Sequence, residues 1–463
     1  MSQKLSDDFQ TLSDQKQGDP EDMVIESIED ALESGYEDAV IEQIGELGPA
    51  AAADLLAKVS DENRETLLDK HATAFDPLVF TELPYDLRKD ILENMEAVQV
   101  AGLLSDLESD DALDMIIDLD PEFQREIIKK LSSRLRLVIE EGLRFPEDSA
   151  GRLMQREFVA IPQFWTVGKT IDYLRKASED LPDEFFDIFI ITPTYKVVGE
   201  VPLNKLVRAP RAEKMEHLVA DAVSLIPADM DQEEVARIFR REDLTSAAVI
   251  DGSQRLIGVI TIDDVIDVID EETQEDIMRL GGVVDGGLHT SSLRTSWNRM
   301  RWLGITLVNT ILASLVISRF EATIEEIVAL AILMPIVAAM GGNAGMQVVT
   351  ITVRGLATKE LSPHNFRRLI AREMTVGTLN GLLFGMIMGG LATLWFGSLM
   401  LGSVLMAAML FNMFWAGIAG TLIPIALTRL GFDPALAAGP FLTTTTDILG
   451  FMAFLGLATL ILL

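Results

Sequence analysis

The stretch Pro440-Phe-Leu-Thr-Thr-Thr-Thr-Asp447-Ile-Leu-Gly450 lies inside the last long apolar run of the chain, residues 435–463. A run of this length exceeds the roughly 20 residues that an α-helix needs to span a bilayer. A carboxylate near its centre costs a few kcal/mol or more to insert, and such residues face a bundle interior, a water-filled path or an ion. The threonines before it add hydroxyl groups that can face the same polar path. The stretch therefore predicts a membrane protein in which a cation passes Asp447.

Four further apolar segments precede this run, at about residues 302–317, 327–353, 374–396 and 404–427, and they predict a transmembrane domain of five helices over residues 299–463. Arginine and lysine cluster before the first segment, between the second and third, and between the fourth and fifth. The positive-inside rule then places the N-terminal part in the cytoplasm and the C-terminus outside. We expect a multi-pass protein of a bacterial-type inner membrane, with the lipid bilayer as its surroundings.

The net charge of −34 belongs entirely to the first 300 residues, because seven acidic and eight basic residues nearly balance from Arg301 onward. Such an acidic surface disfavours nucleic acid and anionic lipid and attracts cations. The alternative, a solvated acidic face that aids solubility, stays open. The sequence predicts cations as partners and no nucleic acid.

The chain contains no cysteine, and its four histidines are scattered without metal-ligand spacing. Disulfides, thiolate metal sites and cysteine nucleophiles are therefore excluded, and a zinc enzyme is not expected. The N-terminus, MSQKLSDDFQ, has no apolar segment typical of a signal peptide, so we expect the front part to stay in the cytoplasm. No enzymatic activity is predicted.

Residues 21–145 repeat a pattern of short amphipathic helices, after a polar tail of residues 1–20 that is predicted to be disordered. Units such as Leu87-Arg-Lys-Asp-Ile-Leu-Glu and Val100-Ala-Gly-Leu-Leu-Ser-Asp-Leu place apolar residues at i, i+3, i+4 and i+7. Proline-containing turns separate the units. The pattern predicts an all-α superhelical domain, which is more often a scaffold than a catalyst.

Residues 146–269 alternate between strand and helix patterns. The clearer unit consists of an amphipathic helix after Asp231, strands at 247–251 and 256–261, and a helix at 262–270. A weaker copy precedes it, with a helix at 167–176, strands at 187–192 and 197–201, and a helix at 203–207. This duplicated α/β pattern resembles a tandem pair of CBS domains.

The second copy contains the Gly-x-x-Thr-x-x-Asp motif of CBS domains as Gly258, Thr261 and Asp264. The resemblance implies that this hydroxyl and carboxylate can meet the ribose or phosphate of an adenosine nucleotide such as ATP. The first copy has Pro202 and Lys205 in the two polar places. A CBS pair that binds nucleotide and one that binds none therefore both remain open.

A helix that begins near residue 262 continues into an acidic connecting segment, residues 270–298. Its carboxylates repel one another unless something neutralises them. A flexible stretch with Gly-Gly pairs is predicted between residues 281 and 299. This segment joins the cytoplasmic domains to the membrane.

The second apolar segment contains Pro335, several glycines, Asn343 and Gln347. The proline and glycines predict a bent or open helix, and the two amides lie i, i+4 apart on one face. Irregular backbone at membrane depth is tolerated where it lines a cavity. Close helix packing through small residues is the alternative. The coincidence of the amides with the breaks favours a pore lining.

Two membrane motifs together resemble the signatures of the MgtE family of magnesium channels: Pro335 with Gly342-Asn343-x-Gly345-x-Gln347, and Asp433-Pro-Ala followed by Pro440-Phe-x-Thr-Thr-x-x-Asp447-x-x-Gly450. The resemblance covers nearly the whole chain, with helical N domain, CBS pair, acidic helix and five spans in the same order. It implies a homodimer with its pore on the two-fold axis. It also implies that Mg²⁺ bound between cytoplasmic domains holds the pore shut.

The resemblance implies that Asp447 supplies the charge of the pore site, while backbone carbonyls around Thr443 and Gly450 orient a hydrated ion. Mg²⁺ dehydrates reluctantly and is typically held through one or two carboxylates and its waters. Asn343 and Gln347 are the further predicted pore residues. Selectivity against Mn²⁺, Co²⁺ and Ni²⁺ stays open.

The resemblance also implies a cytoplasmic Mg²⁺ sensor made of acidic residues. Its predicted members are Asp231, Glu233, Asp243 and Asp264 in the second CBS domain and Asp267, Glu272, Glu275 and Asp276 on the connecting helix. The partners in the N domain stay open, with Asp106, Asp110 and Asp111 as candidates.

The predicted function is Mg²⁺ uptake through a channel or transporter that intracellular Mg²⁺ closes by favouring one compact arrangement of the acidic domains. An ion-coupled secondary transporter of divalent cations is the alternative, because Asp447 could serve a proton or sodium relay. A membrane-anchored nucleotide sensor is a third interpretation, although an anchor needs no buried carboxylate.

Overall fold

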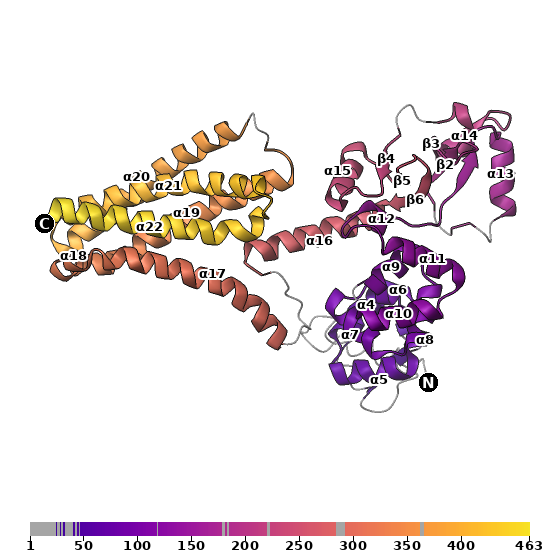
Figure 1. Ribbon diagram of the computed structural model, residues 1–463, viewed down its shortest axis with the longest axis horizontal. Coiled ribbons are helices and arrows are strands. Elements are labelled where there is room, and N and C mark those ends of the chain that lie inside the picture. Colours follow the sequence, from indigo (N-terminus) through magenta and orange to yellow (C-terminus); the bar gives the residue numbers. More distant parts are fainter. Residues whose placement is uncertain are drawn as a thin grey trace, which may run out of the picture. The chain divides into compact units, whose positions relative to one another are not determined.

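The computed structural model describes residues 25, 28, 31, 32, 40, 41, 44, 45 and 47–463, with gaps at 118, 178–180, 183–184, 220–222, 284–291 and 362–364. The predicted tail of residues 1–20 lies outside the described residues, as does the centre of the predicted flexible linker. The chain divides into two compact units, Met1–Glu271 and Glu272–Leu463. Each unit is described by itself (Figure 1).

The first part of unit 1 is all-α, as predicted. Its helices are α4 (Pro49–Lys58), α5 (Asp61–His71), the 3-10 turn η1 (Ala72–Ala74), α6 (Leu78–Thr81), α7 (Tyr85–Asn94), α8 (Ala97–Ser105), α9 (Ser109–Ile117), α10 (Pro121–Lys130) and α11 (Ser133–Gly142). Their apolar faces share one core, in which Leu56, Phe80 and Leu104 are fully buried. Burial of these faces stabilises helices too short to persist alone in water.

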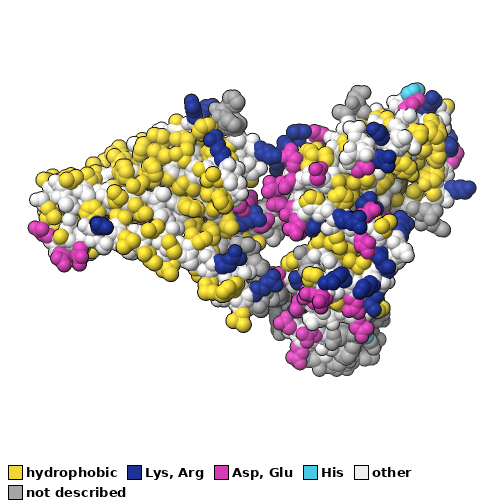
Figure 2. All heavy atoms as spheres, in the orientation of Figure 1, with side chains coloured by type: hydrophobic (Ala, Val, Ile, Leu, Met, Phe, Trp, Pro, Cys, Tyr) yellow, Lys and Arg dark blue, Asp and Glu magenta, His cyan; other side chains and the backbone are white. Residues whose placement is uncertain are grey.

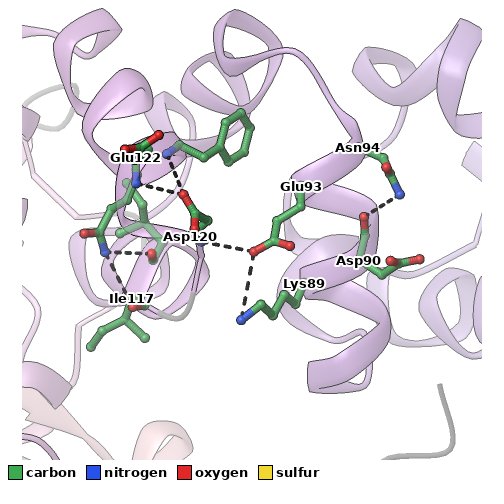
Figure 3. A network of polar contacts seen from close by, with 10 residues as sticks. Lys89, Asp90, Glu93, Asn94, Ile117, Asp120 and Glu122 are labelled. Atoms are coloured by element: carbon green, nitrogen blue, oxygen red, sulfur yellow. Dashed lines mark hydrogen bonds and ion pairs between the residues drawn. The ribbon is translucent and has the colours of Figure 1, made fainter. Parts of the chain in front are cut away.

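A polar network joins the start of α10 to α7 (Figure 3). Asp120 caps α10 by accepting hydrogen bonds from the backbone N–H groups of Glu122 and Phe123. The backbone N–H of Asp120 donates to Glu93 Oε1 at 3.0 Å, and Lys89 Nζ lies 3.9 Å from the same oxygen. Because Asp-Pro begins the helix, the turn that the sequence predicted at this point also fixes how two helices meet.

The second part of unit 1 contains two three-stranded sheets of identical topology. The strands are β1 (Ala160–Pro162), β2 (Asp187–Ile191) and β3 (Val197–Pro202) in one, and β4 (Leu225–Pro227), β5 (Ser246–Ile250) and β6 (Leu256–Thr261) in the other. In each sheet the first pair is parallel and the second antiparallel, and both antiparallel pairs have a register shift at the same place, near Ile191 and Ile250. The repeated register shift confirms the predicted duplication.

The helices around these sheets are α12 (Ala150–Leu153), α13 (Val167–Lys176), α14 (Leu203–Arg208), the 3-10 turn η2 (Met215–His217) and α15 (Gln232–Glu242). The buried Asp187 at the start of β2 accepts hydrogen bonds from the hydroxyls of Thr245 and Ser246, at 3.0 and 2.7 Å. This contact crosses from one copy to the other. A shared apolar core that includes Phe189 and Val259 also joins the copies.

The helix α16 (Ile262–Leu280) follows β6 directly, so the connecting helix begins within the predicted CBS region. The next helix, α17 (Ser292–Ser318), begins about ten residues before the apolar segment that predicted it. The expectation of a flexible stretch up to residue 299 is therefore wrong for residues 292–299. Polar and basic residues extend this helix beyond its apolar part, because helical hydrogen bonds do not depend on apolar side chains.

Within the described residues, five helices are long and apolar enough to cross a membrane, as predicted. They are α17, α19 (Ala329–Ala357), α20 (Phe366–Phe396), α21 (Leu399–Arg429) and α22 (Pro434–Leu462), and the short α18 (Glu321–Glu326) joins the first two. Hydrophobic side chains cover much of their visible outer surface (Figure 2). This surface suits the interior of a bilayer.

A row of glycines on α20 fits the backbone of α21. Gly377, Gly381, Gly385 and Gly389 recur every fourth residue and are all buried. A Cβ atom on Gly389 would lie 2.6 Å from the carbonyl oxygen of Gly402. Small residues at such spacing let two membrane helices approach closely, and dispersion contacts between them then stabilise the pair.

The helix α19 is continuous through Pro335 and its glycines, so the predicted break in the second span is wrong. The glycines instead provide space for neighbouring side chains. A Cβ on Gly341 would clash with Asn412, and a Cβ on Gly345 would lie 2.7 Å from a methyl group of Leu442. Close packing through small residues, the alternative interpretation of this motif, explains Gly341 and Gly345. The pore lining by Asn343 and Gln347 stays a prediction.

Candidate ion path and candidate metal-sensing cluster

Asp447 lies in the middle of the continuous helix α22 and is partly buried. Asp433 begins this helix by accepting a 2.7 Å hydrogen bond from the backbone N–H of Ala435, with Pro434 at the first helical position. A cap of this kind fixes the start of a helix and therefore the register of the residues that follow. The carboxylate of Asp447 is thereby held at mid-span by local sequence signals.

The threonines before Asp447 donate their hydroxyl hydrogens to their own helix. Thr444 Oγ1 donates to the carbonyl of Pro440 at 2.6 Å, and the buried Thr446 donates to Leu442 at 3.1 Å. Thr443 is exposed in the single chain and donates to Pro440 at 3.1 Å. Each hydroxyl oxygen keeps acceptor capacity, so it can still receive a hydrogen bond from water or face a cation.

The sequence analysis missed Asn412, a fully buried amide on α21. Its Nδ2 donates to the carbonyl of Val337 on α19 at 2.9 Å, and its Oδ1 has no hydrogen-bond partner among the described residues. A Cβ on Gly450 would lie 2.6 Å from this Nδ2. Asn412 on α21 thus bonds to α19 and packs against Gly450 of α22, which follows Asp447 by about one helical turn. A lone asparagine inside the apolar run 404–427 was the signal for it.

The two amides predicted to line the pore, Asn343 and Gln347, are exposed on α19 in the single chain, whereas Gly341 and Gly345 beside them are buried. They therefore share a face that α21 and α22 do not cover. Gly450 is buried, so its role in the structure includes making room for Asn412. The roles of these residues toward an ion remain predictions.

An acidic cluster forms in unit 1, where α9 approaches the start of α16. Its members are Glu108, Asp110, Asp111 and Asp114 from the N domain and Asp263, Asp264 and Asp267 from α16. Beside the cluster, Ser109 joins α9 to the segment before β1, because its hydroxyl donates to Glu157 at 2.6 Å. Asp110 and Asp111, two of the three N-domain candidates, belong to this cluster. Asp106 lies at the C-terminal end of α8.

Burial and mutual repulsion raise the pKa values in this cluster. The pKa of Glu108 rises from 4.5 to about 7, first because of burial and then because of the charge of Glu157. Burial also raises the pKa of Asp264 to about 7 and that of Asp111 to about 6, and it raises the pKa of Asp110 well above its ordinary range. Carboxylates in this state gain stability from a proton or a cation.

Among the described residues, no three histidine, aspartate or glutamate side chains lie close enough together to hold one metal ion. The cluster is an acidic surface with several separate carboxylates. Mg²⁺ usually retains several of its waters and takes one or two carboxylates directly. The donor chemistry of the cluster fits that mode of binding.

The acidic residues of the connecting helix lie along α16. Burial raises the pKa of Asp267, and the charge of Glu82 adds to the effect. Burial and the nearby Asp433 raise the pKa of Asp276. Arg279 forms ion pairs with Glu275 in its own helix and with Asp433. Glu272, the remaining predicted sensor residue on this helix, is the first residue of the second unit.

The other predicted sensor residues lie at the ends of α15. Asp231 caps this helix through a 3.0 Å hydrogen bond from the backbone N–H of Glu233, and Asp243 ends it with a left-handed backbone, φ 52°. The main charges that shift the pKa values of the acidic cluster do not include Asp231, Glu233 or Asp243.

The hydroxyl of Thr261 donates to Asp264 Oδ2 at 2.7 Å. The two residues of the CBS motif therefore bind each other, and Asp264 also belongs to the acidic cluster. This double position means that a nucleotide at Thr261 and a cation at the cluster would both act on one carboxylate.

Comparisons with known proteins agree with this arrangement. The model of the MgtE family, described as divalent cation transporters, matches residues 334–457. The models of the MgtE intracellular N domain and of the CBS domain match residues 47–148 and 217–271.

The chain is 31% identical over 448 residues to the magnesium transporter MgtE of Thermus thermophilus, covering 96% of this chain and 99% of the relative. It is 30% identical over 413 residues to the magnesium transporter MgtE of Bacillus subtilis, covering 81% and 91%. A crystal structure of the cytosolic domain of the Mg²⁺ channel MgtE in complex with ATP is also similar. It is 28% identical and covers 53% of this chain and 99% of that chain, with a TM-score of 0.49.

Proposed function

Because this chain belongs to the MgtE family of divalent cation transporters, we propose that it moves Mg²⁺ across the cytoplasmic membrane along a path that includes Asp447. The observation that carries the proposal is the partly buried carboxylate at the middle of a membrane-spanning helix. A charge in that position is costly unless an ion, water or a partner compensates it. The family consists of transporters rather than enzymes.

Mg²⁺ uptake into liposomes that contain the purified protein tests the path. We expect the wild type to take up Mg²⁺ and Asp447→Ala to lose the flux. Asp447→Glu is the matched control, because it keeps the charge and changes only the reach of the carboxylate. Unchanged flux in Asp447→Ala, with both proteins equally reconstituted, would exclude Asp447 from the path.

Coupling to a second ion is the alternative mechanism for the same flux. A carboxylate at mid-span can bind a proton or Na⁺ as well as Mg²⁺. Flux that is independent of imposed pH and sodium gradients would favour a channel. Flux that follows either gradient would identify an ion-coupled secondary transporter.

The acidic cluster and the connecting helix support regulation by intracellular Mg²⁺. Mg²⁺ bound there would relieve the repulsion between α9 and α16 and favour one arrangement of the cytoplasmic part. Neutralising Asp267, Glu272, Glu275 and Asp276 together should leave flux active at high cytoplasmic Mg²⁺. Wild-type inhibition in that variant would refute the role of the connecting helix.

The orientation in the membrane and the dimer belong to the same proposal. Arg367, Arg368 and Arg429 flank the ends of α19, α20 and α21 that we assign to the cytoplasm, which leaves the C-terminus outside.

The exposed amides of Asn343 and Gln347 would be costly against lipid, so a second copy that covers them is expected. The domain boundaries at residues 145, 269 and 298 remain proposals in the same sense.

ATP at the CBS domains is a further part of the proposal, which Thr261 and Asp264 support through their motif. Thr261→Val removes the hydroxyl and keeps the side-chain shape. Calorimetry should show weaker ATP binding to this variant than to the wild type. The absence of ATP binding in the wild type would leave the CBS pair with a structural role.

A further inference from the structure

A cavity of about 150 Å³ lies between α19, α20 and α21, within the membrane-spanning unit. It exists because α20 follows α21 along its glycine row and barely contacts α19. Four polar side chains line it: Arg372, Glu373 and Asn380 from α20 and Gln347 from α19. The remaining lining is mostly apolar. The cavity is large enough to hold several water molecules, each of which occupies about 30 Å³ in the liquid.

Glu373 is the unusual member of this group. Its side chain is 5% exposed, and its Oε1 has no hydrogen-bond partner among the described residues. Arg372 Nε lies 3.6 Å from that oxygen, which is too far for a hydrogen bond, and the Arg372 side chain is 67% exposed. A buried carboxylate oxygen without a partner is energetically costly, so binding of an occupant of the cavity to this oxygen would be favourable.

From this geometry we infer that Glu373, Gln347 and Asn380 form a second site for a partly hydrated divalent cation, separate from Asp447. One carboxylate and two amide carbonyls are oxygen ligands of the kind that Mg²⁺ takes together with its own waters. They reach the cavity from two helices, so an ion there would connect α19 to α20, which otherwise contact each other little.

A structural ion pair between Arg372 and Glu373 is the competing explanation of the buried carboxylate. The two explanations predict different effects on cation binding when either charge is removed. If the pair is structural, removing either charge weakens the fold and leaves cation binding unchanged. If the cavity binds a cation, removing the positive charge of Arg372 tightens binding, and removing the negative charge of Glu373 weakens it.

The inference rests on the proposed function for the identity of the ion, and it concerns a different carboxylate. Gln347 lies one helical turn from Asn343 on the uncovered face of α19. The cavity therefore borders the face of α19 that is predicted to line the ion path. An ion held there would act on that face of the helix.

A single reporter cysteine can test the site, because the chain has no cysteine of its own. Ala344→Cys places a thiol on the cavity wall and keeps the three polar ligands. The full-length protein in lipid nanodiscs is treated with the cationic reagent 2-aminoethyl methanethiosulfonate, and labelling is followed by mass spectrometry. At a Mg²⁺ concentration about ten times the dissociation constant, occupancy should slow labelling about tenfold.

Charge variants in the Ala344→Cys background decide the assignment. Glu373→Gln should abolish the protection by Mg²⁺, and Arg372→Gln should lower the Mg²⁺ concentration that gives half protection several-fold. Leu379→Cys, on the exposed apolar face of α20, is the matched control and should not react. Val376→Cys, which also lines the cavity, replaces Ala344→Cys if that variant fails to fold. Labelling of the cavity thiol that Mg²⁺ does not slow, or no labelling at all, would overturn the inference.

Asp447→Ala separates this site from the proposed ion path. Protection that persists in Asp447→Ala and disappears in Glu373→Gln supports the second site, even if liposome flux fails to support Mg²⁺ transport. Protection that disappears in Asp447→Ala and persists in Glu373→Gln belongs to the path itself. That result would overturn the second site and leave the proposed function intact.

Discussion

Arg279 Nη1 on α16 lies 2.9 Å from Asp433 Oδ2, the carboxylate that caps α22. The last turn of the connecting helix is thereby joined to the first turn of the helix that carries Asp447. Leu280 adds an apolar contact to the same region, in a core that includes Leu442 of α22. A change in the position of α16 therefore has a direct physical route to the helix of the proposed ion path.

Removing this ion pair should weaken the regulation of flux by cytoplasmic Mg²⁺. Arg279→Gln and Asp433→Asn should each raise the half-inhibiting Mg²⁺ concentration, and the double variant should add little to either. Asn retains the cap of α22 and removes only the charge. Both side chains are about one-third exposed, so the coupling free energy from liposome flux should be at most about 1 kcal/mol, or roughly fivefold in concentration.

Arg237→Gln is the matched control for this prediction. Arg237 forms an ion pair with Glu234 within α15, at similar exposure and away from α22. Its replacement should leave the half-inhibiting Mg²⁺ concentration unchanged. Strictly additive effects of Arg279→Gln and Asp433→Asn would contradict a direct coupling between the two residues.

The contact between Asn412 and Gly450 predicts a rescue. A methyl group on Gly450 would clash with the Asn412 amide, and such overpacking costs about 1–3 kcal/mol. Gly450→Ala should therefore lower the unfolding temperature in detergent and reduce flux. Asn412→Ala, which alone loses a buried hydrogen bond, should partly restore stability when combined with Gly450→Ala. A double variant less stable than the sum of the two single effects would refute the proposed contact.

The glycine row of α20 offers a comparison between neighbours. Gly389→Ala should destabilise the helix pair α20–α21, because its Cβ would meet the backbone of Gly402 at 2.6 Å. Gly390→Ala meets no atom within 4 Å, so it should be neutral or stabilise by up to about 1 kcal/mol through helix propensity. Thermal unfolding in detergent measures both. Equal effects of the two substitutions would show that α20 does not pack on α21 through this row.

Most elements of the fold follow from local periodicity in the sequence. Helix α13 has the predicted bounds, and β2 and β3 differ from the prediction by one residue each, because apolar alternation and turn residues mark them clearly. The strands β1 and β4 were missed. Three residues are too few to show a period of two, and their pairing partners lie far along the chain.

The candidate sites depended more on tertiary packing. The sequence identified Asp447 as unusual because one charge in an apolar run is a local signal. It could not reveal that Gly341 and Gly450 surround Asn412, since these residues lie on three different helices. For the same reason the sequence identified acidic residues on α9 and α16 but could not show which of them lie close together. The predicted break in α19 failed because packing against α21 and α22 overrides the weak helix propensity of glycine.

The raised pKa values of the acidic cluster predict an unusual pH dependence for the cytoplasmic part. In the folded state the pKa values of Glu108 and Asp264 are raised to about 7, from 4.5 and 3.8 in the unfolded chain. At a pH between these values the folded state therefore binds more protons than the unfolded state. Stability therefore falls as pH rises through this window. When a chelator keeps Mg²⁺ away, the unfolding temperature of a fragment that ends at Leu280 should fall as the pH is raised from about 5 to about 8.

Mg²⁺ should remove most of this slope, because a bound cation compensates the carboxylates that lose their protons. The double variant Asp110→Asn and Asp264→Asn should flatten the slope in chelator as well, since it removes two of the repelling charges. Asp231→Asn keeps its capping role and lies outside the cluster, so it serves as the control. An unfolding temperature that rises toward pH 8 without Mg²⁺ would show that α9 and α16 do not hold their carboxylates together in solution.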